Sequence, residues 1–145
     1  MKTVNLPIHE TLSNGGQSLF NGADAKTSDW DTIEKVYEAC YRSELYAHFP
    51  ATKEISLQLG IKVQRFQSIF KKKYGKSLKN LLLENRMQYA IELLQRGYRC
   101  QEVSRMVGYG EISAIKFNKM FQKHFGITPK KYQMAKLNQN ITSEK

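Results

Sequence analysis

The stretch FQSIFKKKYG at residues 66–75 has a counterpart, FNKMFQKHFG, at residues 117–126. Both stretches place two phenylalanines four residues apart and a glycine five residues after the second. The similarity continues upstream, where ISLQLGI at 55–61 aligns with VSRMVGY at 103–109. Downstream, a hydroxyl residue follows each glycine by two positions. A repeat of roughly thirty residues indicates two copies of one small structural unit.

Apolar residues in and between the two copies keep helical spacing. They recur every three or four residues, glycines end the apolar segments, and no alternating strand pattern is present. In each copy a short helix, a turn with glycine and a second helix with a basic outer face form the layout of a helix-turn-helix. The sequence therefore predicts an all-α fold with two helix-turn-helix subdomains, at about 50–77 and 98–135, joined by a linker helix at 78–96.

The predicted second helices run from about 63 to 74 and from about 112 to 125. Ser77 and Thr128 are expected to cap the helices that follow them, and the Thr128 helix is expected to be short, ending near Tyr132. Outside the repeat, residues 1–28 are predicted to be a flexible arm, 29–49 an additional helix and 136–145 a frayed polar tail.

The charge of the chain is concentrated in the duplicated region. The net charge is +10, yet residues 1–50 hold four Lys or Arg against seven Asp or Glu, while residues 51–145 hold nineteen against six. Such a distribution favours a polyanion partner, here double-stranded DNA. The alternative is a solvated basic surface that only keeps the protein soluble.

Several functional classes are disfavoured by the sequence. It contains no paired nucleophile and base, no phosphate-binding glycine loop and no metal-ligand cluster, since Cys40 and Cys100 stand alone. We therefore expect neither an enzyme nor a bound cofactor or metal. The chain lacks an apolar run of the ~20 residues that span a bilayer and a visible secretory signal, so we expect no membrane partner and a cytoplasmic location. The exposed aromatics of single-strand RNA platforms are also missing.

The candidate DNA contacts come from the outward faces of the second helices. With the phenylalanines inward, polar and basic groups point outward. The residues expected to read bases are Gln64, Arg65, Gln67, Ser68, Ile115, Lys116 and Lys119. Those expected to contact phosphates are Lys62, Lys71, Lys72, Lys76, Gln122, Lys123 and Lys130. Ile115 suits a thymine methyl group, although Ile112 or Ile115 packing on a neighbouring helix is the alternative.

The linker helix has a length that suits two grooves. At 1.5 Å per residue, roughly eighteen residues span about 27 Å, and successive major grooves on one face of B-DNA lie about 34 Å apart. We therefore expect both second helices to enter neighbouring major grooves, with some bending of the DNA. Arg86, which interrupts the apolar stripe of this helix, is expected to be architectural.

A set of motifs at near-fixed spacing resembles a known family. They are Arg86, Ala90 and Leu93-Leu94 in one helix, Val103-Ser-x-x-Val-Gly-Tyr109, and Phe117-x3-Phe121-x4-Gly-Ile-Thr-Pro129-x2-Tyr132. Together they resemble the DNA-binding domain of AraC/XylS-type transcription regulators over residues 50–135. The resemblance implies a bacterial-type regulator, an activator more often than a repressor, that contacts RNA polymerase, with base reading at Gln64, Gln67 and Ser68.

Many relatives carry a separate effector domain, and residues 1–49 are too few for a ligand-binding barrel. We expect a protein that binds DNA as a monomer and needs no small-molecule effector; the alternative is that the chain is part of a longer product.

The sequence also departs from the family pattern. Lys62 stands where a polar cap usually opens the first recognition helix, Ser68 where a basic residue is frequent, and about two extra residues precede Phe117. Ser56 and Ser104 replace a small residue, commonly alanine, and the replacement costs little if each hydroxyl bonds the backbone four residues earlier. The alternative function is a protein-interaction or non-specific DNA-binding module that keeps the fold and modulates another regulator.

Overall fold

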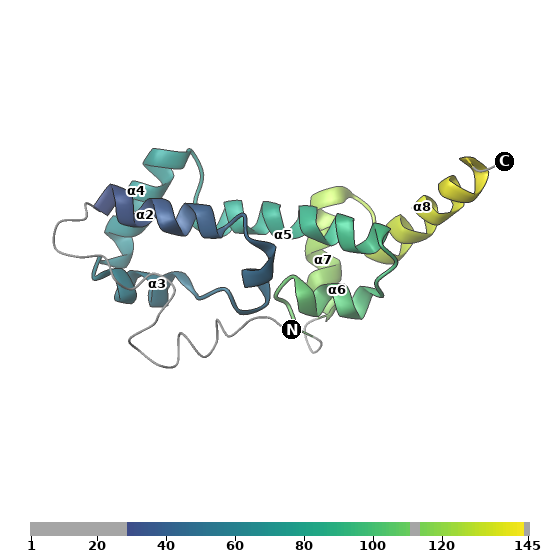
Figure 1. Ribbon diagram of the computed structural model, residues 1–145, viewed down its shortest axis with the longest axis horizontal. Coiled ribbons are helices and arrows are strands. Elements are labelled where there is room, and N and C mark those ends of the chain that lie inside the picture. The colour runs from purple at the N-terminus through teal and green to yellow at the C-terminus, as the bar shows by residue number, and fades with distance from the viewer. Residues whose placement is uncertain (1–28, 111–113, 144–145) are drawn as a thin grey trace. The chain divides into compact units, whose positions relative to one another are not determined.

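The computed structural model describes residues 29–110 and 114–143, and every regular element in these ranges is helical (Figure 1). The all-α prediction is confirmed. The predicted flexible arm at 1–28 lies outside the described residues. The elements in chain order are α2 (Asp29–Ala39), the 3-10 helix η1 (Ser43–His48), α3 (Thr52–Leu59), α4 (Val63–Tyr74), α5 (Leu78–Gln95), α6 (Cys100–Met106), α7 (Ala114–Phe125) and α8 (Pro129–Ser143).

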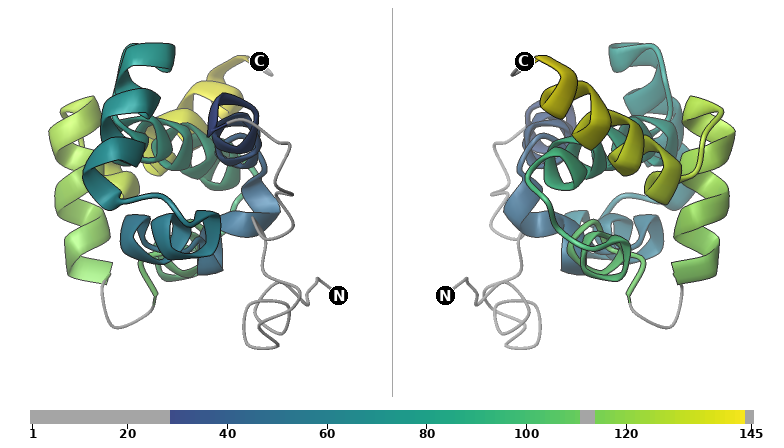
Figure 2. Two further views of the ribbon diagram at one scale, coloured as in Figure 1. Left: turned by 90° about the vertical axis from the view of Figure 1, so that its left-hand side faces the viewer. Right: turned by 90° about the vertical axis from the view of Figure 1, so that its right-hand side faces the viewer.

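The chain divides into two compact units, one through Asn85 and one from Arg86 onward. The division falls inside α5, so this helix contributes to both units. Each unit contains one helix-turn-helix, α3 with α4 and α6 with α7, in which the second helix runs across the first (Figure 2). Glycines make the turns after the motif helices: Gly60 ends α3 and Gly75 ends α4 in the left-handed conformation, with φ of 71° and 80°.

The core of the first unit is built from α2, α3, α4 and the start of α5. Phe66 and Phe70 of α4 are fully buried and cluster with Ile33 and Val36 of α2 and Ile55 of α3. Because α2 supplies several of these side chains, residues 29–49 belong to the first unit. The sequence-based expectation placed them outside the helix-turn-helix domain.

The segment 29–49 is also not one helix. α2 ends at Ala39 and η1 begins at Ser43. The carbonyl oxygen of Cys40 accepts two side-chain hydrogen bonds, from the Tyr46 hydroxyl at 2.7 Å and from the Asn85 amide at 2.8 Å. These donors satisfy a carbonyl that a continued helix would have bonded internally. They explain why the chain turns after Ala39, inside the segment 29–49 that was expected to be one additional helix.

The second unit packs α6, α7 and α8 with the later part of α5. Phe117 and Phe121 of α7 are fully buried, 5.9 Å apart between ring centroids, and Phe121 meets the Tyr132 ring edge-on at 6.1 Å. The buried Gln133 of α8 donates hydrogen bonds to the carbonyl oxygens of Leu94 and Tyr98.

The last helix is longer than expected. Thr128 caps it as predicted, since its Oγ1 accepts a 3.2 Å bond from the Lys131 amide. The helix then continues to Ser143, past Tyr132 and through most of the segment expected to fray. The buried Gln133, which bonds carbonyl oxygens on and after α5, ties this helix to the unit. Within the helix, the Lys136 ammonium lies 5.8 Å from the Tyr132 ring centroid. No glycine or proline follows Pro129 to end it.

Candidate nucleic-acid interface

The first candidate recognition helix, α4, separates an aromatic side from a polar side. Phe66 and Phe70 are fully buried and face the core. The polar residues predicted to read bases or contact phosphate on this helix are all exposed: Gln64, Arg65, Gln67, Ser68, Lys71 and Lys72. The lysines in its last turn also complement the negative end of the helix dipole.

The second candidate recognition helix, α7, has the same division. Phe117 and Phe121 are buried, whereas the predicted contact residues Ile115, Lys116, Lys119, Gln122 and Lys123 are exposed. Ile115 is 70% exposed, so the alternative that it packs on a neighbouring helix is wrong. Ile112, the other residue in that alternative, lies outside the described residues. The segment between Tyr109 and Phe117, where about two extra residues were expected, is described only in part.

Two of the predicted DNA contacts already hold an acidic partner. Arg65 Nε lies 3.0 Å from Asp29 Oδ2, and Lys76 Nζ lies 2.7 Å from Glu84 Oε1. The pairing of Lys76 with α5 reduces the positive charge it can offer to a phosphate. Lys62 at the start of α4 and Lys130 in the first turn of α8 are exposed.

The sequence reasoning missed Asp29 and Lys73. Lys73 donates a 3.1 Å hydrogen bond to the Trp30 carbonyl oxygen, and its ammonium lies 5.3 Å from the Trp30 ring centroid. Both contacts join residues more than thirty-five positions apart. Helical spacing within α4 therefore carries no signal for them.

The motif helices α4 and α6 begin differently. Lys62 makes no side-chain cap bond at the start of α4, as its departure from the family pattern predicted. At α6, the Glu102 carboxylate accepts a 3.0 Å bond from the backbone amide of Arg99. This bond, followed by the Arg99 guanidinium, lowers the pKa of Glu102. Burial raises the pKa of the Tyr109 hydroxyl, and the nearby Arg86 cation opposes that shift.

The serines of the short helices do not bond the backbone four residues earlier. The Ser104 hydroxyl donates forward to the Gly110 carbonyl oxygen at 2.8 Å. The Ser56 oxygen is buried and has no hydrogen-bond partner among the described residues. The two copies of the motif therefore differ at a position where the sequence is the same.

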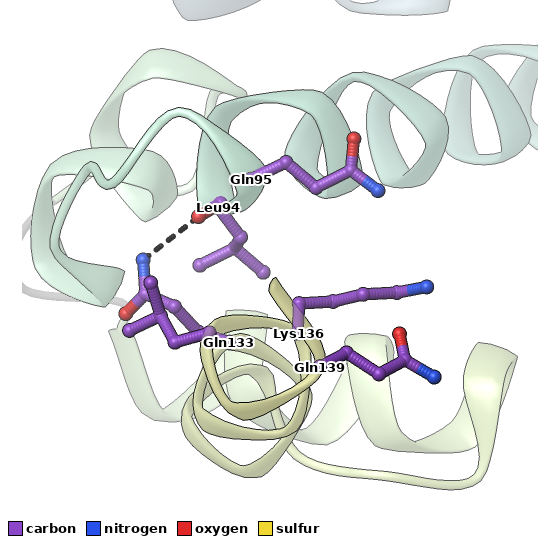
Figure 3. Close-up of a pocket in the computed structure, with 6 residues that line it drawn as sticks. Leu94, Gln95, Gln133, Lys136 and Gln139 are labelled. Atoms are coloured by element: carbon purple, nitrogen blue, oxygen red, sulfur yellow. Dashed lines mark hydrogen bonds between the residues drawn. The ribbon is translucent and has the colours of Figure 1, made fainter. Parts of the chain in front are cut away.

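A shallow pocket of about 320 Å³ lies in the second unit, between the end of α5 and α8. Figure 3 shows Gln133 directed at the Leu94 carbonyl, with Gln95, Lys136 and Gln139 around the opening. Its lining holds amides and one ammonium, and no acid, cysteine or histidine. Over the described ranges, no group of three or more His, Cys, Asp or Glu could hold a metal ion. None of the helices in these ranges is long and apolar enough to cross a membrane.

The two helix-turn-helix motifs coincide with a known sequence family. The pattern of a family described as a helix-turn-helix domain matches residues 55–135, more than half of the chain. The chain belongs to the AraC-type helix-turn-helix family. The resemblance noted from the sequence is confirmed. This AraC-type family consists of DNA-binding transcription regulators and is non-enzymatic, which agrees with the expectation that the chain is not an enzyme.

Individual relatives of this AraC-type chain are distant. The HTH-type transcriptional activator CsvR and the transcriptional activator AggR, both of Escherichia coli, are each 40% identical to it over 53 residues. The matched part covers 36% of this chain and only 19% of either relative. The C-terminal domain of the two-component response regulator yesN from Fusobacterium nucleatum has a TM-score of 0.61 at 28% identity, covering 69% of this chain and 95% of that one.

Proposed function

We propose that this AraC-type protein binds double-stranded DNA sequence-specifically, with α4 and α7 as recognition helices in adjacent major grooves. The observation that supports the proposal most directly is shared by both helices. Each buries two phenylalanines and exposes amide, hydroxyl or cationic groups on its remaining surface. A helix held by its aromatic side can present its polar side to base edges.

The exposed side chains have the chemistry of direct readout. The amides of Gln64 and Gln67 can pair with adenine N6 and N7, and Arg65 and Lys119 with guanine O6 and N7. Ser68 and Lys116 add further hydrogen-bond donors, and Ile115 suits the methyl group of thymine. Lys62, Lys71, Lys72, Gln122, Lys123 and Lys130 would contact phosphates, with Lys76 a weaker contributor because of Glu84.

The length of α5 supports binding to two successive grooves. Its 18 residues span about 27 Å, against about 34 Å between successive major grooves on one face of the duplex. DNA bending toward the protein would close this difference. Because one chain carries two reading motifs, we propose that it binds DNA as a monomer.

Activation of transcription through contact with RNA polymerase is part of the proposal. Its support is that CsvR and AggR are named transcriptional activators.

A selection of bound duplexes from a random pool tests the proposal. We expect one asymmetric motif with two half-sites about one helical turn, or ~10 base pairs, apart. A pool that stays random while the protein still binds in a salt-dependent manner would contradict sequence reading. A fusion of the selected motif upstream of a reporter promoter then tests activation, with a scrambled motif as the control.

A second candidate function is a non-specific DNA-binding or protein-interaction module that modulates another regulator. It is favoured by the start of α4, where Lys62 leaves the helix without a side-chain cap. A loosely held helix start would weaken base reading, because the first turns of a recognition helix carry most base contacts. The same selection separates the two functions.

A further inference from the structure

We infer that Asp29, from the helix preceding the helix-turn-helix, is a positioning residue that orients Arg65 to read a guanine. The inference rests on the proposed function, since it requires α4 to enter a major groove. It adds a specificity-determining residue that lies outside the matched family segment, which begins at residue 55.

The geometry of the pair supports this role. Asp29 Oδ2 accepts a 3.0 Å hydrogen bond from Arg65 Nε. The guanidinium carries five N–H donors in a rigid planar fork. Engaging Nε leaves the two terminal nitrogens, whose parallel N–H groups match guanine O6 and N7, available to DNA. The contact with Asp29 therefore restricts the Arg65 side chain through Nε, an atom that guanine recognition by the two terminal nitrogens does not use.

The carboxylate is held in place by the body of the first unit. Asp29 lies in the first turn of α2, and this helix is anchored by the buried residues Ile33 and Val36. Lys73 adds a second anchor, because its ammonium donates to the Trp30 carbonyl oxygen at 3.1 Å. A carboxylate fixed in this way can limit the rotamers of Arg65 before DNA arrives, and preorganisation lowers the entropic cost of the contact.

The exposure of the pair also fits a role in binding. The side chains of Arg65 and Asp29 are 64% and 39% exposed, so the guanidinium is accessible to a ligand. An exposed ion pair contributes little to folding. The opposing interpretation is that Asp29 competes with DNA for Arg65 and so inhibits binding. Because the two interpretations give opposite signs for removal of the carboxylate, one experiment decides between them.

The experiment uses the full chain and the duplex motif it selects. Guanines in that motif are replaced one at a time by 7-deazaguanine, which lacks the N7 acceptor. We expect the wild-type protein to lose about tenfold in affinity at one guanine, within the usual range for a bidentate contact. Arg65→Ala should become insensitive to that replacement, because alanine has no donor for guanine N7.

Asp29→Asn is the decisive variant. Asparagine also suits a helix start, so α2 should be retained, which a thermal unfolding curve checks. We expect about fivefold weaker discrimination at that same base pair, with affinity for random DNA equal to or above wild type because a negative charge has been removed. In a protein that already carries Arg65→Ala, Asp29→Asn should have no further effect on discrimination at that base pair. Glu38→Gln, which removes an exposed charge from the same helix, is the matched control and should leave discrimination unchanged.

Three results would overturn the inference. If Asp29→Asn raised the affinity for the selected motif and for random DNA by the same factor, the Asp29 carboxylate would be inhibiting DNA binding through its charge. Retained sensitivity to 7-deazaguanine in Arg65→Ala would show that Arg65 reads no guanine, and the proposed function would still stand. Failure of the wild-type protein to select any motif would instead overturn the proposed function and this inference together.

Discussion

The Ser104 hydroxyl donates a 2.8 Å hydrogen bond to the Gly110 carbonyl oxygen, across the turn between α6 and α7. Its counterpart in the first motif, Ser56, is equally buried, and its hydroxyl has no hydrogen-bond partner in the part of the chain that the structure describes. A made hydrogen bond and a buried unsatisfied hydroxyl affect stability in opposite directions.

We therefore expect alanine at the two serines to have opposite effects. Ser56→Ala removes an unsatisfied group and should stabilise the first unit by up to about 1 kcal/mol, whereas Ser104→Ala should destabilise the second by about 1 kcal/mol. Denaturant unfolding followed by fluorescence of Trp30, the only tryptophan, measures the stability of the first unit. Hydrogen exchange of the α6 amides measures the stability of the second unit. Equal destabilisation by both substitutions would show that Ser56 has found a partner in solution.

Gln133 links α8 to the rest of the second unit. Its Nε2 donates to the carbonyl oxygens of Leu94, at 2.9 Å, and Tyr98, at 2.8 Å. Gln133→Ala removes both bonds and leaves a small cavity, so we expect a loss of about 1–3 kcal/mol in unfolding free energy and faster amide exchange along α8. Gln139→Ala, an exposed glutamine on the same helix, is the control and should change the unfolding free energy by less than about 0.5 kcal/mol. Similar losses for the two variants would contradict the anchoring role.

The Glu102 carboxylate makes the stability of α6 depend on pH. Its folded-state pKa is lowered, chiefly by the Arg99 backbone amide. A lowered pKa means that the contribution to stability is present above the ordinary glutamate value, about 4.3, and is lost as the pH falls through the folded-state value. Glu102→Gln keeps an acceptor for the amide but cannot titrate. Denaturation midpoints should therefore converge for wild type and variant in acid and separate above pH ~5, with wild type the more stable. A constant difference across this range would show that the carboxylate has no special role.

The helices themselves could be predicted from short-range patterns. Phenylalanines four residues apart and the glycine after them, as at Phe66, Phe70 and Gly75, predict both the buried face and the end of α4. The outward faces follow from the same geometry, so the exposure of Gln64 and Lys71 was predictable once the helix was placed.

The differences between expectation and structure come from contacts distant in sequence. α2 ends at Ala39 because Tyr46 and Asn85 bond the Cys40 carbonyl, and Asn85 is 45 residues away. α8 continues past Tyr132 with the support of Gln133, whose acceptors lie on and after α5. The Asp29–Arg65 pair belongs to the same class, since local periodicity specifies neither partner. A sequence pattern identifies which face of a helix is polar, but it does not identify what meets that face.

The last prediction separates phosphate contacts from base contacts on α4. Lys71 is exposed, whereas Lys76 is paired with Glu84 at 2.7 Å. Lys71→Ala should weaken binding to all DNA sequences and reduce the slope of log affinity against log salt by about one. Lys76→Ala should change the slope less, because Glu84 already offsets its charge.

Gln64→Ala should leave the salt slope unchanged and relax the preference for one base pair by about 1–3 kcal/mol. Titrations of the selected motif and of a scrambled duplex at several salt concentrations measure both quantities for all three variants. If Gln64→Ala and Lys71→Ala weaken both duplexes by the same factor, α4 contacts only the DNA backbone, and the base-reading role proposed for Gln64 is wrong. If Lys76→Ala matches Lys71→Ala, the ion pair with Glu84 opens on DNA and Lys76 is a full phosphate contact.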